Sequence, residues 1–471
     1  MKRFLALAVL LAFSVIGLGC GSSNSSSSNS NSGGSDPQSG AVFVTGEDAP
    51  ASSVVGFNVT IDKITLNNSN STVTALSTPE AVDFARLIGL RTLLGFNTVQ
   101  QGTYNSVTFT FENTSPAPVI SYVDLSTTPP SVQTLTGSFS QTVVTIPFPA
   151  GAPLVVGNNE LAGLRIDFDL HDSLVTNNGQ ITGVINPVID VSAVSASSSV
   201  GQITEFTGNV VSVNTTGNSF LMQGPYGLPR TIDVTPSTQY NGSNSLNTLT
   251  MNAIVSVVGT MQADGSILAS AVEMITTDKA FVSGRVLAVN PTSGPVQSVT
   301  MWVGEELGTS GVIPVDTVAT INLSAVTTYD VCFFDNLLTS QIFNDASLVV
   351  GQRIFIGGSV NGSTFTPNMV SLRRQGVWGT LVADSVTITG GTGSNLGYFE
   401  MQNDALMSYS AGGPFTVLTG NLTNFENIDG LSGLAAAGTP NMISRGLVFK
   451  DQSNGKPVVV AGHVRILPPG E

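Results

Sequence analysis

Apolar and polar residues alternate one by one along most of the chain beyond residue 41, and this pattern constrains the fold more than any other feature. The clearest stretches are residues 57–62, 107–112 and 164–171. A period of two places successive side chains on opposite faces of an extended strand, so each stretch predicts a strand with one buried face. Because 41% of the 471 residues are hydrophobic, the chain can also bury a core. The sequence therefore predicts an all-β body.

Glycine, proline and cap residues mark where the strands are interrupted. A Ser-Thr pair before Pro79 and a glycine at Gly95 predict a helix over Pro79–Leu94, which Gly89 breaks or divides into two short helices. A second helix is expected over Ile428–Ala437. Dipeptides typical of tight hairpin turns are Asn178-Gly179, Asp264-Gly265, Asn361-Gly362 and Asn454-Gly455.

The second half of the chain contains internal repeats. Gly208–Val213 resembles Gly284–Val289, and Gly379–Ala383 is a third copy of the same motif. A second motif follows each copy, at Val257–Met261, Ile356–Val360 and Val460–Val464. Glycines at fixed places in strands are typical of sharply bent small barrels, although a chain rich in Val and Gly also produces chance similarity. We expect an N-terminal β-sandwich with a short helical insertion, followed by two or three small β-barrel-like modules in tandem.

The first residues have the pattern of an export signal. Lys2 and Arg3 precede an apolar stretch, Phe4–Leu18, that is too short for a permanent membrane helix. The run Gly17–Cys20 resembles the lipobox of bacterial lipoproteins, although a leucine is usual where Gly17 stands. The resemblance implies cleavage before Cys20 and acylation of that cysteine, giving a stable lipid anchor. The alternative is a plain secretory signal with an accidental cysteine.

A stretch of Ser, Asn and Gly follows Cys20 and predicts a flexible tether. Gly21 rather than Asp after the cysteine resembles the sorting rule for the outer membrane, so we expect an outer-membrane or cell-surface location. The predicted organisation is a signal peptide at 1–19, a lipidated cysteine and tether at 20–40, a β-sandwich at 41–195, and modules at 200–277, 278–375 and 376–471.

Charge and cysteine content exclude several classes of protein. Removal of residues 1–19 takes away two basic residues and leaves 14 basic against 31 acidic ones, a net charge of about −17. Such a chain repels phosphate backbones, so nucleic acid is not an expected partner. With Cys20 acylated, Cys332 has no cysteine to pair with. It reads as a strand residue with a buried, inert thiol, the alternative being a reactive one.

Standard catalytic signatures are missing. The chain has no G-x-S-x-G, no H-E-x-x-H and no G-x-x-x-x-G-K motif. A serine-histidine-acid triad would depend on His171 or His463, the two histidines present. We therefore assign no catalytic residue and no resident cofactor from the sequence.

The strongest polar motif is Arg165-x-Asp167-x-Asp169-x-His171, followed by Asp172. A period of two places the first four side chains on one face of one strand. Asp167, Asp169 and Asp172 are candidate calcium ligands, since carboxylate oxygens are what calcium prefers. The alternative is a solvated strand face on which Arg165 offsets the acids. Upstream, Asp48 in the turn before Pro50 is expected to cap its own turn.

Carbohydrate binding is a reasonable expectation for an exported β-sandwich. Sugar-binding platforms favour exposed Trp and Tyr, whereas this chain has 23 Phe against 2 Trp and 7 Tyr. Trp302 and Trp378 are the candidate ligand-binding aromatics, with packing in the core as the alternative for both.

Several of these segments also occur together in known families. Val42–Pro50, Val82–Phe84, Gly102–Tyr104 and Asp167–Asp169, with Pro187 downstream, resemble a bacterial lipoprotein family, domain of unknown function 4382, over residues 41–195. An inserted Gly-Glu at residues 46 and 47 departs from its pattern. The repeat modules resemble domain of unknown function 5666 over residues 200–375. The resemblance implies a cell-envelope lipoprotein and brings no known activity.

Three functions remain open at this point. The first is a non-enzymatic binding or scaffold protein, held at the membrane by its lipid anchor and contacting an envelope protein or a polysaccharide. The second is an enzyme acting on envelope glycans or peptides through carboxylates alone, which needs no histidine. The third is a surface adhesin stabilised by calcium near Asp167 and Asp169.

Overall fold

The structure is a computed structural model that describes residues 38–49, 53–87, 90–124, 127, 131–178, 180–224, 228–391, 393–403, 414–451 and 454–467. Pro37–Glu471 form one compact unit. Strands make up 58% of the described residues and helices 6%, which confirms the all-β class. The predicted signal peptide, Cys20 and the tether as far as residue 37 lie outside the described residues. Among the residues described, no helix is both long and apolar enough to cross a membrane.

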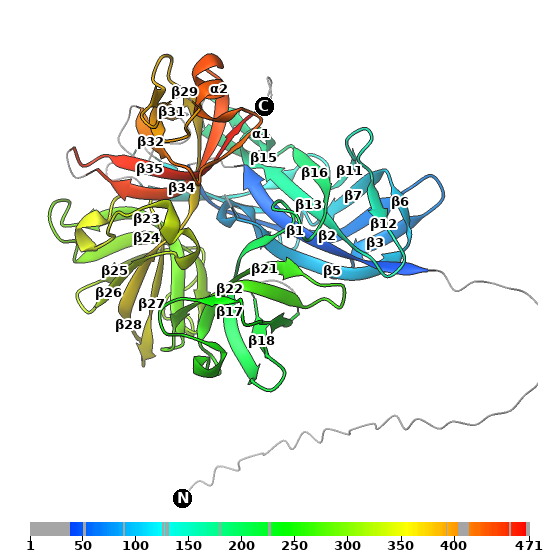
Figure 1. Cartoon of the computed structure of the whole chain (residues 1–471), viewed down its shortest axis with the longest axis horizontal. Coiled ribbons are helices and arrows are strands. Elements are labelled where there is room, and N and C mark those ends of the chain that lie inside the picture. Colours follow the sequence, from blue (N-terminus) through cyan, green and yellow to red (C-terminus); the bar gives the residue numbers. More distant parts are fainter. Residues whose placement is uncertain are drawn as a thin grey trace, which may run out of the picture. The chain divides into compact units, whose positions relative to one another are not determined.

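Two sheets form the N-terminal part, in blue to cyan-green in Figure 1. The four-stranded sheet contains, in spatial order, β16 (Ile189–Val194), β13 (Leu161–Asp169), β1 (Ser39–Ala49) and β5 (Thr92–Gln100). The seven-stranded sheet contains β11 (Val143–Pro147), β7 (Ser106–Phe111), β2 (Val54–Asn67), β8 (Val119–Asp124) and β9 (Ser131–Thr136), with β3 (Thr72–Leu76) and β4 (Glu80–Asp83) also paired to β2. Smaller sheets join β10 (Ser138–Phe139), β15 (Gln180–Ile185) and β14 (Leu174–Asn177), and β12 (Leu154–Val156) with β6 (Gly102–Tyr104).

The two large sheets pack face to face through one core, which makes the N-terminal part the predicted sandwich. Phe57 of β2 and Phe168 of β13 have ring centroids 5.4 Å apart across the layers. In β7 every second residue is buried, so the predicted alternation over residues 107–112 is confirmed. Such burial of alternate large side chains from two sheets is what holds a sandwich together.

The helix predicted over Pro79–Leu94 is wrong for most of its length. Its first residues form β4, which pairs with β2, and its last residues belong to β5. The short helical insertion is a single 3₁₀ turn, η1 (Phe84–Arg86). The second predicted helix is confirmed as α2 (Gly430–Ala436).

Strand pairing wins over helix in this stretch because the sandwich satisfies its residues better. Val82 and Phe84 are buried in the sandwich core. The carboxylate of Asp83 accepts the backbone N–H of Phe57 at 2.8 Å. Tertiary contacts of this kind routinely override local helix propensity.

Three further sheets follow, each belonging to one of the tandem modules. The first contains, in spatial order, β19 (Arg230–Asp233), β18 (Ser219–Gln223), β17 (Ile203–Asn214), β21 (Ile254–Met261), β22 (Ile267–Thr276) and β20 (Gln239–Tyr240). The second contains β25 (Thr317–Asn322), β24 (Ser298–Leu307), β23 (Ala280–Asn290), β27 (Arg353–Asn361), β28 (Thr364–Leu372) and β26 (Thr328–Val331). The third contains β29 (Gln375–Leu381), β34 (Asn441–Lys450), β35 (Pro457–Ile466), β32 (Phe415–Thr419), β31 (Gly397–Asn403) and β30 (Thr387–Ile388), with β33 (Asn424–Glu426) paired to β35.

Extra pairings close the first and third sheets into rings, β19 with β22 and β29 with β31. Short helical elements connect the strands: η2 (Leu246–Thr248), η3 (Phe333–Leu338), η4 (Asp345–Ser347) and, in the sandwich, α1 (Leu170–Ser173). Three of the four predicted hairpin dipeptides lie at the expected turns, between β21 and β22, β27 and β28, and β34 and β35. The fourth includes Gly179, which is outside the described residues.

The opening glycine of each repeat has the same physical role. A Cβ atom at Gly208, Gly284 or Gly379 would lie 2.0, 1.7 or 2.4 Å from a carbonyl oxygen of the neighbouring strand. No other residue tolerates so close an approach. The third copy, which opens at Gly379, is therefore equivalent to the other two in space as well as in sequence.

The predicted position of the second motif in the third copy is wrong by one strand. Gly259 and Gly358 lie at β-bulges in β21 and β27, the strands that pair with the opening strand of each module. In the third module that strand is β34, and the bulge is at Gly446. The predicted match, Val460–Val464, lies one strand later in β35. Each of these adjacent strands contains a glycine close to valine residues, so only the strand pairing distinguishes the two.

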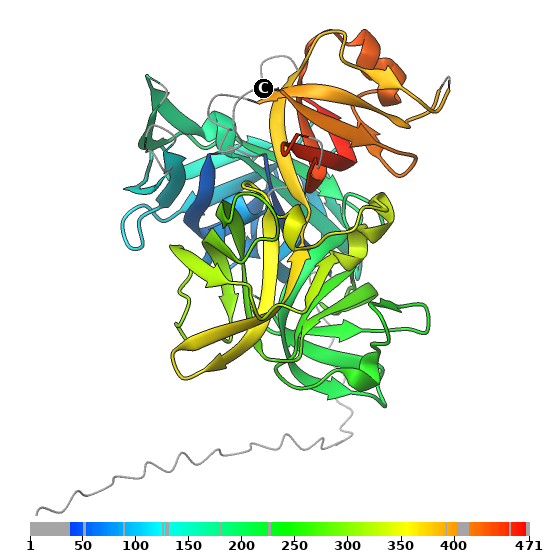
Figure 2. The same ribbon diagram turned by 90° about the vertical axis from the view of Figure 1, so that its left-hand side faces the viewer.

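The modules pack against one another within the compact unit rather than standing apart. Phe43 of β1 and Leu93 of β5 belong to the core of the first module. Leu447 and Phe449 of β34 belong to the core of the second module. Figure 2 shows the third module, in orange and red, from a second direction. These shared cores bring polar residues of the sandwich, the connecting segments and the third module to one place.

Candidate functional site

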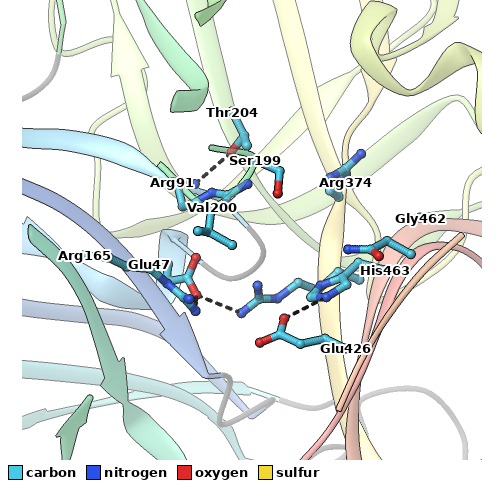
Figure 3. A pocket seen from close by; sticks show the side chains of 12 residues that line it. Glu47, Arg91, Arg165, Ser199, Val200, Thr204, Arg374, Glu426, Gly462 and His463 are labelled. Carbon is cyan, nitrogen blue, oxygen red and sulfur yellow. Dashed lines mark hydrogen bonds and ion pairs between the residues drawn. The ribbon is translucent and has the colours of Figure 1, made fainter. Parts of the chain in front are cut away.

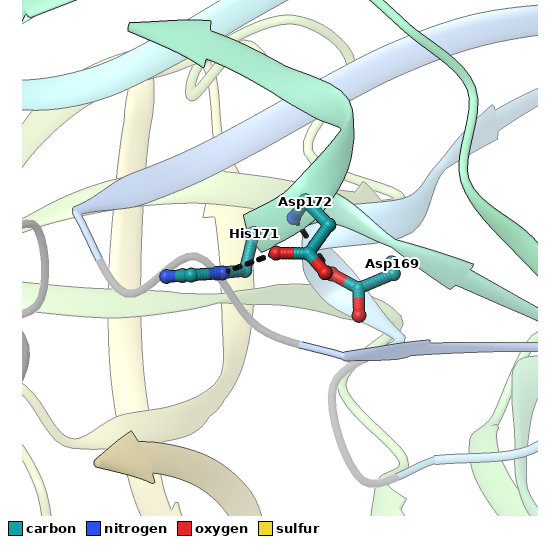
Figure 4. Close-up of side chains that lie close together, drawn as sticks. All are labelled: Asp169, His171 and Asp172. Carbon is teal, nitrogen blue, oxygen red and sulfur yellow. Dashed lines mark hydrogen bonds and ion pairs between the residues drawn. The ribbon is translucent and has the colours of Figure 1, made fainter. Parts of the chain in front are cut away.

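The sequence-predicted metal ligands are only partly brought together. Asp169 ends β13, and His171 and Asp172 follow in α1; the three ligand atoms lie within 4.8 Å of one another (Figure 4). The Nδ1 atom of His171 lies 2.8 Å from Asp172 Oδ1. The backbone N–H of Asp172 donates to Asp169 Oδ1 at 2.9 Å. Asp169 therefore acts as the N-cap of α1, and His171 is placed beyond the strand rather than on its face.

Asp167, the third predicted ligand, has arginine partners instead. Its Oδ2 atom lies 3.1 Å from Nη1 of Arg465 and 3.5 Å from Nη2 of Arg165. Asp167 is 4% exposed, so this position of the strand face is buried rather than solvated, and Arg165 is one of the partners of its charge. Its burial follows from the central position of β13 and from β35, which contributes Arg465. Burial, and next the negative charge of Glu47, raise the pKa of Asp167 to about 7.

Both tryptophans are buried. Trp302 is 2% exposed and packs with Val55 and Val123 of the sandwich. Trp378 is 8% exposed and stacks on the His171 ring, with centroids 4.4 Å apart. Neither ring presents the open face that a sugar platform needs. Both tryptophans are packed in the protein interior, which is the alternative given above.

Two other expected features also have different surroundings. Glu47 and Asp48 lie inside β1 and are buried, so the turn predicted there is wrong. Burial raises the pKa of Asp48 well above its usual range.

Cys332 follows β26 instead of belonging to it, and it is buried as predicted. Burial raises the pKa of its thiol, which makes it a poor nucleophile.

A polar cavity of about 150 Å³ is the best candidate for a binding site (Figure 3). Its charged lining consists of Glu47, Arg91, Arg165, Arg374, Glu426, Arg445 and His463. The sandwich supplies β1, β13 and the start of β5, and the third module supplies β33, β34 and β35. The wall is completed by Ser199 and Val200, which precede β17, and by Thr204 within it.

Local contacts hold these segments around the cavity. The backbone N–H of Arg91 donates to Thr204 Oγ1 at 2.8 Å, and the N–H of Thr204 donates to the Arg91 carbonyl at 3.1 Å. Arg374 forms an ion pair with Asp335. A Cβ at Gly462 would lie 3.5 Å from Arg374 Nη2 and 2.9 Å from a methyl carbon of Leu338, so a glycine is needed at this close approach.

Positive charge exceeds its local partners in the cavity. Glu47 forms an ion pair with Arg165, while Arg445 Nη2 lies 3.7 Å from Glu47 Oε1, beyond hydrogen-bond distance. Within the described part of the chain, Nε and Nη2 of Arg445 have no hydrogen-bond partner, and the residue is 7% exposed. Buried N–H groups that lack a hydrogen-bond acceptor cost free energy, even though the charge of Arg445 faces Glu47 at 3.7 Å.

The pKa values of Arg91 and Glu47 are shifted by burial and by the charges gathered in the cavity. Burial lowers the pKa of Arg91 to about 10. The charge of Glu47 opposes this shift, and the charges of Arg165, Arg445 and Arg374 add to it. Burial by itself would raise the pKa of Glu47, but Arg445, Arg165 and Arg91 together bring it down to about 2. The cavity thus holds four cationic groups and an ionised carboxylate at neutral pH.

The other carboxylate lies at the more open side of the cavity. Glu426 Oε2 lies 3.0 Å from Nε2 of His463, and the Glu426 side chain is 34% exposed. This hydrogen bond is the main cause that lowers the pKa of Glu426 to about 2. Burial lowers the pKa of His463. Glu426 therefore presents an ionised acceptor to anything that enters.

A second ionic cluster nearby joins the modules and has no room for a ligand. Arg373 is fully buried and pairs with Glu273 at 2.7 Å and with Glu205 at 3.4 Å. Arg353 pairs with Glu205 at 2.6 Å, and both arginines lie over the ring of Phe355. The adjoining cavity is about 10 Å³, no larger than one water. This cluster is structural.

Sequence reasoning missed the arginine-lined cavity. Arg91, Arg374 and Arg445 come from separate segments, and no motif joins them. One signal was available: Arg445 interrupts an otherwise apolar strand in which every residue from 442 to 449 is buried. A charge on a two-sided buried strand indicates a specific partner.

Comparison with known proteins supports the two family resemblances. No curated protein matches the chain. Residues 39–183 match the family described as Domain of unknown function (DUF4382), and residues 200–273 match Domain of unknown function (DUF5666). The second match ends within the first module, short of the expected residue 375. The DUF5666 match thus follows the DUF4382 match along the chain, with residues 184–199 between them.

Proposed function

We propose that this chain is a non-enzymatic binding protein of the cell envelope, anchored through Cys20, that holds a small anionic ligand in the arginine-lined cavity. The observation that carries the proposal is the buried guanidinium of Arg445, whose Nε and Nη2 atoms lack hydrogen-bond partners among the described residues. Arginine is the residue best suited to carboxylate and oxyanion recognition, because its planar fork donates two parallel hydrogen bonds. An anion in the cavity would lie beside this positive charge.

The enzyme alternative receives less support from the cavity. Glu47 and Glu426 both line it, as a carboxylate mechanism would require. Each has a pKa lowered to about 2. Glycoside hydrolysis needs one carboxyl group that keeps its proton near neutral pH to protonate the leaving group. Neither glutamate is suited to that role, so binding is the function that we propose.

The calcium alternative is weaker still. Calcium prefers six to eight oxygen ligands. The group near α1 offers two carboxylates and an imidazole, and Asp167 is taken by arginines. The anion cavity has the more specific chemistry.

Calorimetric titration of the full chain carrying Cys20→Ser, at constant ionic strength, tests the proposal with acetate, sulfate and inorganic phosphate. We expect at least one of these anions to bind, and Arg91→Met and Arg445→Met to weaken that binding at least tenfold. Arg230→Met is the matched control, because Arg230 lies over Phe96 and does not line the cavity. Absence of binding by every anion, or equal binding in all variants that keep the parent unfolding midpoint, would refute the proposal.

A further inference from the structure

Resting on the proposed anion site, we infer that its ligand is an acidic sugar, a hexuronate whose carboxylate meets the arginines and whose hydroxyl groups meet Glu426 and Asn424. The cavity contains both a cationic part and an acceptor part. Phosphate and sulfate satisfy only the first. A uronate offers a carboxylate to the cationic part and hydroxyl groups to the acceptor part.

The cationic part is suited to one carboxylate. Arg91, Arg165, Arg374 and Arg445 provide four positive charges. Arg165 and Arg445 face Glu47, and Arg374 pairs with Asp335. Arg445 is the most buried of the four and keeps two nitrogens without partners in the described structure. A carboxylate entering there gains charge-assisted hydrogen bonds in a site shielded from water.

The acceptor part distinguishes a sugar from an inorganic oxyanion. Glu426 is ionised and partly exposed, and Asn424 beside it on β33 is exposed. The dianion of inorganic phosphate carries two negative charges and a single P–OH donor, so most of its oxygens would face the Glu426 carboxylate with like charge. Sugar hydroxyls donate as well as accept, and a carboxylate is a strong acceptor for them.

Size and lining agree with a single sugar unit. The cavity of about 150 Å³ has room for several waters, in contrast to the cavity of about 10 Å³ beside Arg353. It is well below the roughly 300–1,000 Å³ of pockets for drug-sized ligands. Val200 and Gly462 give it a less polar wall against which the C–H groups of a sugar ring pack. A free hexuronate and a hexuronate at the end of a polysaccharide both offer this chemistry.

The test is calorimetric titration of the full chain carrying Cys20→Ser with D-glucuronate, D-glucose, acetate, inorganic phosphate and a hexuronate oligomer, at constant ionic strength. We expect D-glucuronate to bind at least tenfold more tightly than acetate or phosphate, with no binding of D-glucose. Tighter binding of the oligomer would identify a polysaccharide end as the source, and weaker binding would identify the free sugar; either result requires the uronate preference.

Two variants make the test specific. Glu426→Gln removes a negative charge and keeps the shape, so phosphate and acetate should bind more tightly while D-glucuronate loses at least fivefold. Asn424→Ala changes an exposed residue and should weaken D-glucuronate alone. If phosphate or acetate binds as tightly as D-glucuronate, this inference is overturned and the anion site stands. If no probe binds the parent chain, the proposed function fails with it.

Discussion

Glu47 and Asp167 are register partners on the adjacent parallel strands β1 and β13, yet their carboxyl groups have opposite pKa shifts. Burial acts on both. Three arginines, led by Arg445, overcome it at Glu47 and bring its pKa to about 2. At Asp167, burial and the negative charge of Glu47 outweigh the neighbouring arginines and raise the pKa to about 7. The pair therefore holds one ionised group and one group that titrates near neutrality.

The raised pKa of Asp167 predicts that the protein becomes less stable as pH rises from about 4 to about 7. A folded-state pKa above the unfolded value means that the native state binds the proton more tightly, so stability is present at low pH and is lost as pH rises. Asp83 and Asp169, with pKa values of about 6, act in the same direction. Thermal unfolding midpoints should be higher at pH 5 than at pH 8.

Asp167→Asn provides the control, because it mimics the protonated group at every pH. The difference in midpoint between pH 5 and pH 8 should shrink in this variant. Below about pH 4, the lowered pKa values of Glu47 and Glu426 predict the opposite trend, since those carboxylates stabilise the fold only when ionised. A midpoint that rises steadily from pH 5 to pH 8 would contradict this account.

Arg373→Met should destabilise the body by about 3–5 kcal/mol, because it leaves the buried carboxylate of Glu273 without its arginine and takes one of two arginines from Glu205. Urea unfolding at constant pH measures the loss. Arg230→Met is the control and should cost no more than about 1 kcal/mol, the value of a partly exposed cation–π contact. Adding Glu273→Gln to Arg373→Met should recover part of the loss. Equal effects of the two single variants would show that the cluster does not hold the modules together.

Gly446→Ala should destabilise the third module by about 1–3 kcal/mol, since a Cβ there would lie 2.0 Å from the Val460 carbonyl oxygen. Gly420→Ala is the matched control, because nothing lies within 4 Å of a Cβ at that position. Thermal unfolding of both variants checks the difference. Equal midpoints would remove Gly446 as the equivalent of Gly259 and Gly358.

Cys20→Ser should abolish incorporation of radiolabelled palmitate into the protein in cells, whereas Cys332→Ser should leave it unchanged. Acylation needs an accessible thiol, and Cys332 is buried with a raised pKa. Electrophoresis of the immunoprecipitated protein measures the label. Palmitate retained in Cys20→Ser would contradict the proposed anchor.

Much of the fold could be predicted from the sequence because it depends on local patterns. The alternation over residues 107–112 requires one buried face, and the glycines at Gly208, Gly284 and Gly379 are required by close strand contacts. The errors arose where pairing decided the outcome. Pro79–Leu94 has a helical pattern, but β2 offered its residues a sheet partner, and Val460–Val464 could be placed only once β34 and β35 were distinguished.

By itself, then, the sequence determined the all-β class, the tandem repeats and the acidic charge, since each depends on composition or on residues close in the chain. Only the tertiary structure decided the site. It separated Asp167 from Asp169 and Asp172 by giving Asp167 an arginine from β35, 298 positions away. It also gathered Arg91, Arg374 and Arg445 around one cavity. The physical reason is that buried charges need partners, and the packing of distant strands determines which partners they meet.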